Sequence, residues 1–369
     1  MNELKLQKDK WEKVQLGEIC KLEYGNNLTD KMRKGGHVPV YGSAGIVGWH
    51  DAPLTCSATL IVGRKGSVGN VFYSPIPCFP IDTTYYVQET KCKEDLRWLE
   101  LFLSYYDLRQ LNMATAVPGL NRNIAHLIEI PLPPLEEQKQ IAALFQSIET
   151  AIEQVDGQEK NILNLKNQLL RELFGEKQQL GNYLNENDFE KVKFEQIAFC
   201  ISERVEPQKT TLNTYVGLEH LDPDNLVIAR TGIPDDVIGT KLKIYKGDII
   251  FGKRRAYQRK VAVSHFDGIA SAHSMILRAN EKYIEKEFLP FFMQSDVFMN
   301  RAIQISEGSL SPTIKWKTLA SQEFILPKKE KQKELTEVFK HFDITREQLK
   351  HQKTTLKNLK QKLLNEILG

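Results

Sequence analysis

Clustered cations and amides, rather than catalytic acids or nucleophiles, are the residues of this 369-residue sequence best arranged to do chemistry. The stretch 241–260 holds eight basic residues and one acid, Asp248. Arg, Lys, Asn and Gln side chains can pair with the edges of DNA bases, and clustered cations bind phosphates. The pattern is compatible with DNA contact, although such clusters are common as solvated surface runs and the sequence alone favours that second interpretation. The candidate residues are Lys253, Arg254, Arg255, Tyr257, Gln258 and Arg259.

A glycine-rich loop in the first half, Val62–Asn70, presents another pair of cations, Arg64 and Lys65. A phosphate-binding P-loop needs the spacing G-x-x-x-x-G-K-[ST] before a helix, and that spacing is absent. Strand-like runs flank the loop on both sides, so we expect a β-turn that exposes the two cations. Tyr41–Gly48 is also glycine-rich but lacks the spacing of a dinucleotide-binding fingerprint.

Catalytic and metal-binding patterns are weak in this sequence. The one Pro-Pro pair, Pro133-Pro134, lacks the flanks of the adenine-methylating signature, and no H-E-x-x-H or Cys/His zinc spacing occurs. Asp82 with Glu89 and Lys91 resembles a nuclease pattern in which carboxylates hold Mg²⁺ and the Lys aids the attacking water. A Tyr-Tyr-Val strand with polar flanks explains these three residues equally well. We therefore expect no active site and no metal site.

The cysteines and the hydropathy indicate the compartment. Five cysteines, an odd number without C-x-x-C spacing, suit a reducing cytoplasm better than a disulfide framework. No apolar stretch approaches 18 residues, and the N-terminal residues do not form a secretory signal. We expect a cytoplasmic protein with no membrane partner.

The whole-chain charge does not identify the partner. Lys plus Arg number 50 and Asp plus Glu 47, so the formal net charge is +3. This balance excludes histone-like polycation binding and the polar excess of a disordered chain, but it is compatible with a local basic patch. A length of 369 residues, 41% of them hydrophobic, allows two or three domains with their own cores.

The segments that must position these residues form an internal sequence repeat. Ile130–Gly175 aligns without a gap with residues 324–369 at an offset of 194, with 16 identities in 46 positions. The starts of the halves also match, Trp11–Val14 with Phe189–Val192, at an offset of 178. The difference between the offsets, 194 − 178, gives the second globular segment 16 extra residues. Similar composition alone does not explain the shared Leu-Pro, phenylalanine and final glycine.

Each repeat predicts a long helix that begins after Pro134 or Pro327 and closes on Gly175 or Gly369. Apolar residues in steps of four and three predict a coiled-coil seam. The seam consists of Ile141, Phe145, Ile148, Ile152, Val155, Ile162, Leu169 and Leu173, with Leu335, Phe339, Phe342, Leu349, Leu356, Leu363 and Ile367 in the second helix. Charged residues interrupt one side of the seam, at Glu159, Lys166, Arg346, Lys353 and Lys360.

Charge indicates that the two helices are partners. Residues 131–175 contain 4 basic and 7 acidic residues, a net of −3, whereas residues 325–369 contain 11 and 6, a net of +5. Opposite charges bias the choice of a partner helix. Antiparallel pairing would then place the two globular segments at opposite ends. Two separate helices, each folded on its own domain, are the alternative.

Short strand-like runs and turn residues predict mixed globular segments, with helices over Leu96–Leu111 and Glu285–Arg301. The expected fold class is α+β: two mixed α/β domains separated by an antiparallel two-helix coiled coil, with an internal pseudo-two-fold repeat. The expected boundaries are 1–130 for the first domain, 131–180 for the first helix, 181–325 for the second domain and 326–369 for the second helix.

The chain from Trp11 to Gly369 resembles the specificity subunit of type I restriction–modification systems. The resemblance depends on the two dissimilar segments, the two matching helices and the junction Ile130–Lys139, I-P-L-P-P-L-E-E-Q-K. The opening Trp11–Ile19 and the turn Gly119–Asn123 also fit. The second junction, Ile325–Gln332, lacks the second proline and the leucine, so its helix depends on the repeat.

The resemblance implies a non-catalytic subunit that reads a bipartite, asymmetric site in double-stranded DNA, with one target-recognition domain per half-site. The paired helices would form a spacer and dock two modification subunits, and restriction subunits would join that core. S-adenosylmethionine, ATP and Mg²⁺ would be held by those partners, and no cofactor by this chain. Arg64, Lys65, Asn121, Arg122 and Asn123 would contact one half-site, and the six candidates between Lys253 and Arg259 the other.

Two alternatives from other classes stay open at this point. One is a self-contained, magnesium-dependent nuclease that uses Asp82, Glu89 and Lys91. The other is a coiled-coil scaffold without a DNA role, in which the repeat only builds a binding surface.

Overall fold

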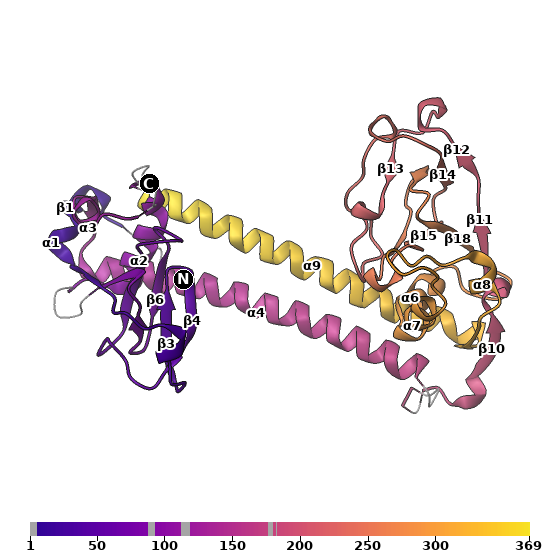
Figure 1. Ribbon diagram of the computed structural model, residues 1–369, viewed down its shortest axis with the longest axis horizontal. Coiled ribbons are helices and arrows are strands. Elements are labelled where there is room, and N and C mark those ends of the chain that lie inside the picture. Colours follow the sequence, from indigo (N-terminus) through magenta and orange to yellow (C-terminus); the bar gives the residue numbers. More distant parts are fainter. Residues whose placement is uncertain (1–5, 88–92, 112–118, 176–179, 182) are drawn as a thin grey trace. The chain divides into compact units, whose positions relative to one another are not determined.

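The computed structural model describes residues 6–87, 93–111, 119–175, 180–181 and 183–369 (Figure 1). The contacts within the chain divide it into two compact units. Unit 1 is Met1–Val155 together with Gln352–Gly369, and unit 2 is the continuous stretch Asp156–His351.

The described residues of unit 1 form short strands, three short α-helices and parts of both long helices. Its strands are β1 (Glu12–Gln15), β2 (Leu22–Tyr24), β3 (Val38–Gly42), β4 (Gly45–His50), β5 (Thr59–Gly63), β6 (Val71–Ser74), β7 (Phe79–Pro80), β8 (Thr84–Val87) and β9 (Glu129–Leu132). Its short helices are α1 (Leu16–Ile19), α2 (Leu96–Tyr106) and α3 (Arg122–His126). The strands pair in the orders β2-β8-β5-β6, β4-β3-β7 and β1-β9, all antiparallel except β3 with β7. The runs predicted as strands around Ile61, Phe72 and Tyr86 are confirmed as β5, β6 and β8.

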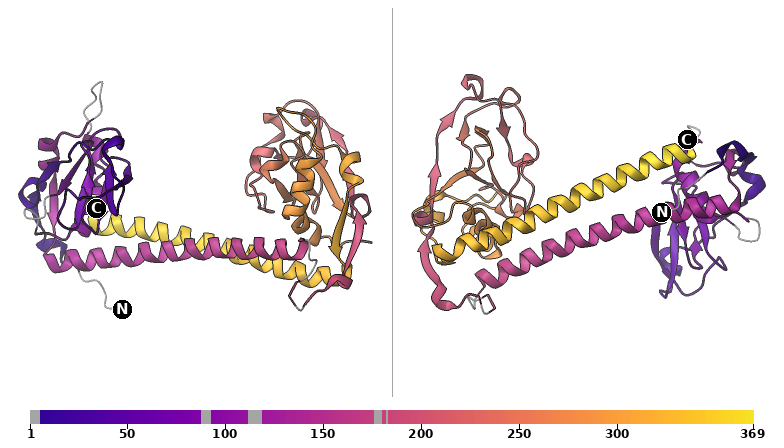
Figure 2. Two further views of the ribbon diagram at one scale, coloured as in Figure 1. Left: turned by 60° about the horizontal axis from the view of Figure 1, so that its bottom comes forward. Right: turned by 180° about the vertical axis from the view of Figure 1, so that it is seen from behind.

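The core of unit 1 forms where α2 and the beginning of α4 (Leu135–Phe174) pack against the strands (Figure 2). Trp98 on α2 and Phe145 on α4 are completely buried in this cluster, beside Leu60 and Val62 of β5. The burial of large apolar side chains from helix and sheet in one cluster is the main source of stability for such a domain. The loop that leaves β5 is therefore mounted on a rigid base.

The helix predicted over Leu96–Leu111 is shorter in the structure. The side chain of Asp95 caps α2 by accepting N–H bonds from Arg97 and Trp98. The helix ends because Asp107 adopts the left-handed conformation, with φ of 57°. A 3-10 turn, Leu108–Leu111, follows.

Unit 2 repeats part of this plan. Its strands are β10 (Phe189–Lys193), β11 (Ala198–Ile201), β12 (Arg204–Val205), β13 (Tyr215–Val216), β14 (Lys241–Ile244), β15 (Ile249–Phe251), β16 (Val261–Val263), β17 (Gly268–Ala270), β18 (Met275–Ala279) and β19 (Glu323–Pro327). Its helices are α5 (Phe194–Ile197), α6 (Phe288–Gln294), α7 (Asp296–Gln304) and α8 (Trp316–Ala320), with α9 (Lys329–Leu368) entering from its N-terminal end. The sheet β11-β18-β15-β16 and the pair β10-β19 match β2-β8-β5-β6 and β1-β9 of unit 1, and a further sheet has the order β12-β14-β17-β13.

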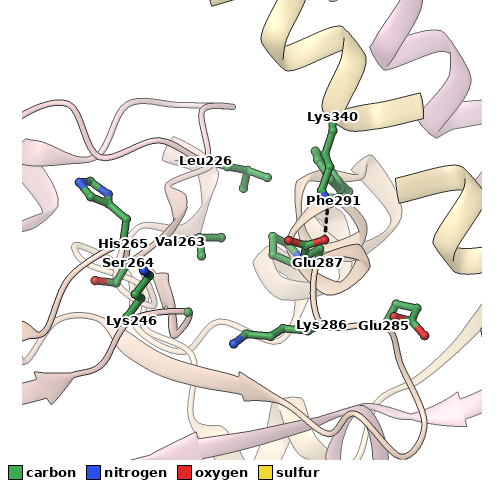
Figure 3. Close-up of a pocket in the computed structure, with 12 residues that line it drawn as sticks. Leu226, Lys246, Val263, Ser264, His265, Glu285, Lys286, Glu287, Phe291 and Lys340 are labelled. Atoms are coloured by element: carbon green, nitrogen blue, oxygen red, sulfur yellow. Dashed lines mark hydrogen bonds and ion pairs between the residues drawn. The ribbon is translucent and has the colours of Figure 1, made fainter. Parts of the chain in front are cut away.

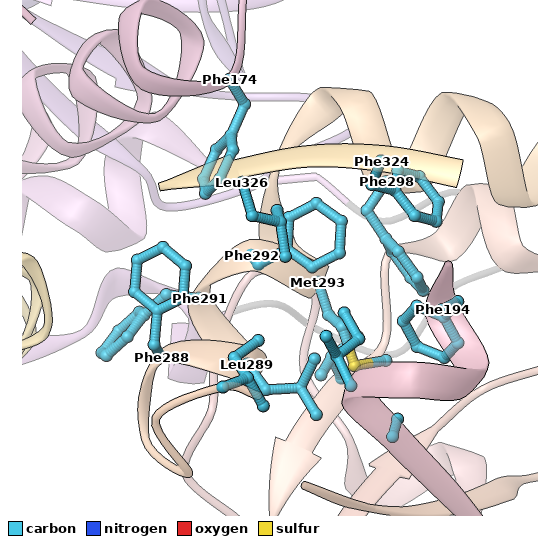
Figure 4. Packing of buried hydrophobic residues seen from close by; sticks show 14 of the residues in the cluster. Phe174, Phe194, Phe288, Leu289, Phe291, Phe292, Met293, Phe298, Phe324 and Leu326 are labelled. Atoms are coloured by element: carbon cyan, nitrogen blue, oxygen red, sulfur yellow. The ribbon is translucent and has the colours of Figure 1, made fainter. Parts of the chain in front are cut away.

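Aromatic side chains fill the core of unit 2 (Figure 4). Phe292 of α6 lies 5.1 Å, centroid to centroid, from Phe324 of β19 and 5.3 Å from Phe174 at the end of α4. Phe298 of α7 packs against Phe194 of α5 at 5.5 Å. Edge-on and tilted ring pairs at these distances add to the hydrophobic stabilisation. The core therefore ties α4, α6, α7 and β19 together.

The helix predicted over Glu285–Arg301 is divided into α6 and α7. Ser295 lies between them in an extended conformation, with ψ of 151°. Its side chain accepts the N–H of Phe298 and so caps α7. Ser295 within this largely apolar run is the sequence signal that could have predicted the break between α6 and α7.

The predicted limits of both long helices are confirmed. α4 begins directly after Pro134 and α9 begins two residues after Pro327, and the residues after their ends are Gly175 and Gly369. Each helix start is fixed by a buried glutamine that is identical in the two repeats. Gln138 accepts the N–H of Asp95 at 2.9 Å and donates to the carbonyl of Pro133 at 2.9 Å. Gln332 likewise accepts the N–H of Glu285 and donates to the carbonyl of Pro327, both at 2.8 Å.

Ion pairs join α4 to α9 within each unit. In unit 1 the ammonium of Lys360 lies 2.6 Å from the carboxylate of Glu149. In unit 2 Lys166 lies 2.6 Å from Asp343, and Arg346 lies 3.6 Å from Glu159. The residue numbers of each pair add to nearly the same sum, so the two helices run antiparallel. Four of the five charged residues expected to interrupt the seam therefore link the helices: Glu159, Lys166, Arg346 and Lys360.

The first two of these pairs are related by the internal repeat. Glu149 and Asp343 occupy equivalent positions at the offset of 194, and so do Lys166 and Lys360. The same ion pair therefore occurs once in each unit. In unit 2 α4 supplies the lysine and α9 the acid, and in unit 1 α9 supplies the lysine and α4 the acid. This exchange is the signature of the predicted pseudo-two-fold repeat.

The predicted seam residues are buried to different degrees. Ile141, Phe145 and Ile148 belong to the core of unit 1, with Ile152, Leu363 and Ile367 packed in the same cluster. Leu169, Leu173, Leu335, Phe339 and Phe342 belong to the core of unit 2. Val155 is buried, and Ile162, Leu349 and Leu356 are half-buried. Each helix thus contributes one end to the core of unit 1 and the other end to the core of unit 2, so the alternative of two separate helices, each folded on its own domain, is wrong.

The compact units do not follow the four-part division expected from the sequence. Each unit takes one globular segment and part of both long helices. The boundaries 1–130, 131–180, 181–325 and 326–369 remain a prediction about segments of the chain.

Candidate nucleic-acid interface

Arg64 and Lys65 stand at the end of β5, in a turn that leads back to a strand as predicted. The backbone N–H groups of both residues donate to the carbonyl of Thr83, at 2.9 and 3.1 Å. Gly63 precedes them, and a Cβ built there would lie 2.2 Å from the carbonyl oxygen of Ser67, so only glycine fits. The backbone of the turn is therefore fixed, and Lys65 is exposed.

The turn before α3 lies alongside this loop. The N–H of Leu120 donates to the carbonyl of Arg64 at 2.9 Å. Asn121 caps α3, with its side-chain oxygen accepting the N–H groups of Asn123 and Ile124. The cap places Arg122 in the first turn of α3, next to Arg64. An open cavity of about 440 Å³ results, lined by Tyr24, Arg64, Lys65, Tyr85, Gly119, Leu120, Asn121, Arg122 and Asn123.

The structure thus brings together all five residues predicted for the first half-site. The lining contains three cations and no carboxylate. A carboxylate oxygen of Glu23 lies 3.8 Å from the guanidinium of Arg122. Such a hollow attracts phosphate and offers amide and guanidinium donors to base edges.

Sequence reasoning missed the two tyrosines of this cavity. The guanidinium carbons of Arg64 and Arg122 lie 4.9 and 5.0 Å from the centre of the Tyr24 ring. Tyr85 is buried, and its hydroxyl donates to the carbonyl of Leu120 at 2.9 Å. Burial, with Tyr24 beside it, raises the pKa of Tyr85 to about 12, against the opposing charges of Arg64 and Arg122. Nothing in the spacing of Tyr24 and Tyr85 along the chain marks them as part of one site.

Unit 2 carries an equivalent loop at the end of β15. The N–H of Ile314 donates to the carbonyl of Lys253 at 3.0 Å, as Leu120 does to Arg64 in unit 1. Isolated bridges pair Arg254 with Thr313 in unit 2 and Lys65 with Gly119 in unit 1. Lys253 and Arg254 are therefore the structural counterparts of Arg64 and Lys65.

Further cations surround the loop of unit 2. A guanidinium nitrogen of Arg254 lies 3.1 Å from Nε2 of His273. Burial lowers the pKa of His273, and the charges of Arg254, Lys253 and Lys241 add to that shift. Burial also lowers the pKa of Lys253, opposed by Cys200 and supported by Arg204. His273 thus lies against this loop, and Arg204 of β12 and Lys241 of β14 add positive charge near it.

The remaining candidates of the second half differ in their surroundings. Arg255 and Tyr257 are exposed and Gln258 is half-exposed. Arg259 instead holds the unit together, through Nε to Asp224 at 2.7 Å and a terminal nitrogen to the carbonyl of Gln294 at 2.6 Å. Because its guanidinium is already bound, we leave Arg259 out of the candidate interface.

Another cavity of unit 2, about 620 Å³ in volume, has mixed charge (Figure 3). Lys340 pairs with Glu287 at 2.5 Å on one side of it, and Lys286 lies opposite Leu226 and Val263. The carboxylates of Glu285 and Glu287 disfavour a phosphate backbone here. The basic loops are therefore the better candidates for nucleic acid.

The residues of the nuclease alternative are only partly described. Asp82 is exposed in the turn between β7 and β8, while Glu89 and Lys91 lie outside the described residues. Among the residues that the structure does describe, no group of three His, Cys, Asp or Glu side chains could hold a metal ion. Within the same residues, no helix is long and apolar enough to span a bilayer.

The fold and the two equivalent basic loops define a duplicated protein built around two antiparallel helices. The chain belongs to the family of type I restriction modification DNA specificity domains, whose sequence profile matches residues 8–165 and 223–358. Similar proteins include the type I restriction enzyme MjaVIII specificity subunit of Methanocaldococcus jannaschii, 25% identical over 306 residues, which cover 76% of this chain and 71% of that protein. The type I restriction enzyme EcoDI specificity subunit of Escherichia coli is 22% identical over 398 residues, covering 96% of this chain and 87% of that protein.

Solved structures show the same fold. The S subunit of a type I restriction–modification system from M. genitalium superposes with a TM-score of 0.66 at 16% identity, over 98% of this chain and 96% of that one. A chain from a study of complex assembly and conformational transition in the type I R-M system gives a TM-score of 0.59 at 16% identity, over 98% of both chains. The predicted family and the α+β fold with a coiled coil are confirmed.

Proposed function

We propose that this specificity subunit reads a bipartite, asymmetric site in double-stranded DNA, one half-site with each basic loop. The observation that carries the proposal is the structural equivalence of the loops after β5 and β15, both fixed by the same backbone bond and both rich in cations. The loops differ in their side chains, with Arg64 in one and Lys253 in the other. Base contacts specify the sequence, so different side chains on equivalent loops read different half-sites.

A second part of the proposal is that each unit docks one copy of the modification subunit. Burial accounts for repeat identities such as Phe145 with Phe339, which are both completely buried. It does not account for identities on an exposed face of the helices. Gln158, Leu165 and Glu172 lie on such a face in unit 2, and their identical counterparts Gln352, Leu359 and Glu366 in unit 1. We call each set a repeat stripe.

The repeat stripes have the geometry of a docking surface used twice. Their members are seven residues apart, which is close to two helical turns, so they share one face of a helix. Leu165 is 52% exposed and Leu359 is 43% exposed. Burial in a core therefore does not explain why both repeats have a leucine at this position. Two copies of one partner require two equal surfaces, and the repeat stripes supply them.

The chemistry of the complex is proposed to belong to the partners. The modification subunits would hold S-adenosylmethionine, and the restriction subunits that join the core would supply ATP and Mg²⁺ chemistry. This chain would contribute sequence recognition and assembly, in the cytoplasm where the DNA lies.

Methylation mapping with the reconstituted complex tests the recognition half of the proposal. The variant Lys253→Gln/Arg254→Gln should relax one half-site, by about 1–3 kcal/mol per affected base, and leave the other half-site unchanged. The control Lys246→Gln/Lys286→Gln removes the same charge from the mixed-charge cavity and should leave the motif intact. An unchanged motif and unchanged affinity in the first variant would reject the assignment of this loop.

The two alternatives give different results in the same preparation. Mg²⁺-dependent cleavage by the purified chain alone, abolished by Asp82→Ala, would identify a nuclease. A complex that retains no DNA sequence-selectively at any salt concentration would leave only the scaffold.

The docking half of the proposal is tested by stoichiometry. Leu165→Asp and Leu359→Asp should each remove one modification subunit from the complex in native mass spectrometry, and the double variant should remove both. Ile344→Asp is the matched control, since Ile344 is 55% exposed but its repeat counterpart is Thr150. Loss of the partner in the control, or two bound copies in the double variant, would contradict docking on the repeat stripes.

A further inference from the structure

The guanidinium of Arg64 is held by aromatic rings rather than by acceptors. Its carbon lies 4.9 Å from the ring centre of Tyr24 and 5.9 Å from that of Tyr85. Within the part of the chain that the structure describes, no carboxylate or carbonyl accepts a bond from its N–H groups. Its backbone is fixed on both sides, by Thr83 and Leu120. The side chain is therefore oriented while its donors stay free.

The two rings form a rigid support. Tyr24 on β2 and Tyr85 on β8 are directly opposite each other in the sheet. Their rings meet edge to face, 5.1 Å between centroids at an angle of 61°. Tyr85 is completely enclosed and anchored through its hydroxyl to Leu120, whereas Tyr24 is 47% exposed. The half-exposed ring of Tyr24 thus lines the cavity and packs on the buried ring of Tyr85.

A guanidinium held in this way suits one kind of target. Stacking fixes its plane without using its five donors, so less side-chain freedom is lost when a ligand binds. The free edge of the fork matches two acceptors side by side, and guanine offers such a pair, O6 and N7, in the major groove. A phosphate also accepts a fork, but a phosphate contact tolerates a mobile Lys equally well.

The equivalent position of unit 2 lacks this support. There Lys253 replaces Arg64, and the repeat places Ser202 and Met275 where unit 1 has Tyr24 and Tyr85. Lysine is a mobile point charge that cannot form a planar fork. The stacked arginine is thus a property of unit 1 rather than a general requirement of the fold.

We propose that Arg64 reads a guanine in the half-site of unit 1, and that Tyr24 is the positioning residue that makes this reading selective. The inference rests on the proposed function and deepens it. The half-site read by unit 1 should contain one invariant G·C pair. Discrimination at that pair should depend on the ring of Tyr24, while the attraction to phosphate should not.

The test uses the chain reconstituted with its modification subunits, and the half-site of unit 1 is the one left intact by Lys253→Gln/Arg254→Gln. Methylation rates are compared for duplexes with G·C or A·T at each position of that half-site. Arg64→Lys keeps the charge but loses the fork, and should reduce discrimination at one position about 10- to 100-fold. Tyr24→Leu should reduce it at the same position by about 10-fold, with the salt dependence of binding unchanged. Tyr24→Phe keeps the ring and should restore the wild-type ratio.

Tyr283→Leu is the matched control, because Tyr283 is also exposed beneath a cation but lies outside both basic loops. Thermal unfolding of each variant shows that the fold is retained. The inference is overturned if the wild-type half-site contains no invariant G·C pair, or if Tyr24→Leu behaves like Tyr283→Leu. Failure of the proposed function has another signature, since the wild-type complex would then show no sequence-selective methylation.

Discussion

The two ion pairs related by the repeat make a quantitative prediction, because they place the same charges in different surroundings. The side chain of Lys166 is 6% exposed and that of Lys360 is 29% exposed. Burial lowers the pKa of Lys166, and Asp343 opposes that shift. We consider the variants Asp343→Ala and Glu149→Ala, which remove the equivalent acid from each pair.

The expected magnitudes differ by a few-fold. Breaking a buried pair strands a charge and costs about 3–5 kcal/mol. The carboxylate of Asp343 is 30% exposed, and Gln294 keeps one acceptor 3.0 Å from the ammonium of Lys166. We therefore expect about 2–3 kcal/mol for Asp343→Ala, at or just below the lower limit of that range. Glu149→Ala frees Lys360, which can turn to water, and also removes the 2.6 Å ion pair of Glu149 with Arg97, which keeps Glu100 at 2.5 Å. Because these partners are partly exposed or still paired, the variant should cost about 1 kcal/mol.

The four tryptophans allow each unit to be followed separately. Trp316 lies in unit 2, and Trp11, Trp49 and Trp98 lie in unit 1. Urea unfolding of the 5-fluorotryptophan-labelled chain, followed by ¹⁹F NMR, therefore reports both transitions. Asp343→Ala should shift the transition reported by Trp316 to a lower urea concentration. The double variant Lys166→Met/Asp343→Leu, which leaves no buried charge unpaired, should recover most of the lost free energy of unfolding.

Two results would refute this reasoning. The first is equal destabilisation by Asp343→Ala and Glu149→Ala, which would mean that burial does not set the cost. The second is a double variant less stable than Asp343→Ala, which would mean that the ammonium stabilises the helix pair beyond neutralising its partner.

Three further predictions concern other parts of the chain. Tyr85 keeps its proton up to about pH 12 when folded and releases it near pH 10 when unfolded, so unit 1 should lose stability as pH rises from 10 to 12. Burial also raises the pKa of Tyr41 and Tyr86 in the same unit, so Tyr85→Phe should reduce that slope in urea titrations without abolishing it. Arg259→Ala should destabilise unit 2 by about 1–3 kcal/mol through its lost bonds to Asp224 and the Gln294 carbonyl, while methylation mapping gives an unchanged motif. Seven residues inserted into each long helix, after Gly157 and His351, add about 10 Å and should lengthen the non-specific spacer by about three base pairs without altering either half-site.

The long helices and the main strands could be predicted because their signals are local. Pro134 and Gly175 mark the limits of α4, and the apolar steps between them specify a buried face. The run around Ile61 is apolar throughout and bounded by turn residues, which is sufficient for β5. The end of α2 at Asp107 was missed because the left-handed conformation of a residue other than glycine depends on what packs around it, which the local sequence does not show.

The cavity of unit 1 was predicted only in part because it is assembled from distant segments. Arg64 and Arg122 are 58 positions apart and meet through one backbone bond, from Leu120 to Arg64. Tyr24 joins them through strand register, which depends on the whole sheet. Composition also does not show which cation of a basic run finds a carboxylate, and Arg259 does so in the folded unit.

Unit 2 is one continuous stretch of chain, whereas unit 1 is interrupted by all of it. The buried Ile367 and Leu368 of α9 complete the core of unit 1. A ribosome must therefore add the 196 residues of Asp156–His351 (351 − 156 + 1) before it reaches the closing segment of unit 1. At about 5–20 residues per second this takes roughly 10–40 seconds. The part of the protein that is synthesised first is consequently the last to be completed, and during that interval the apolar face of its unfinished core is open to chaperones.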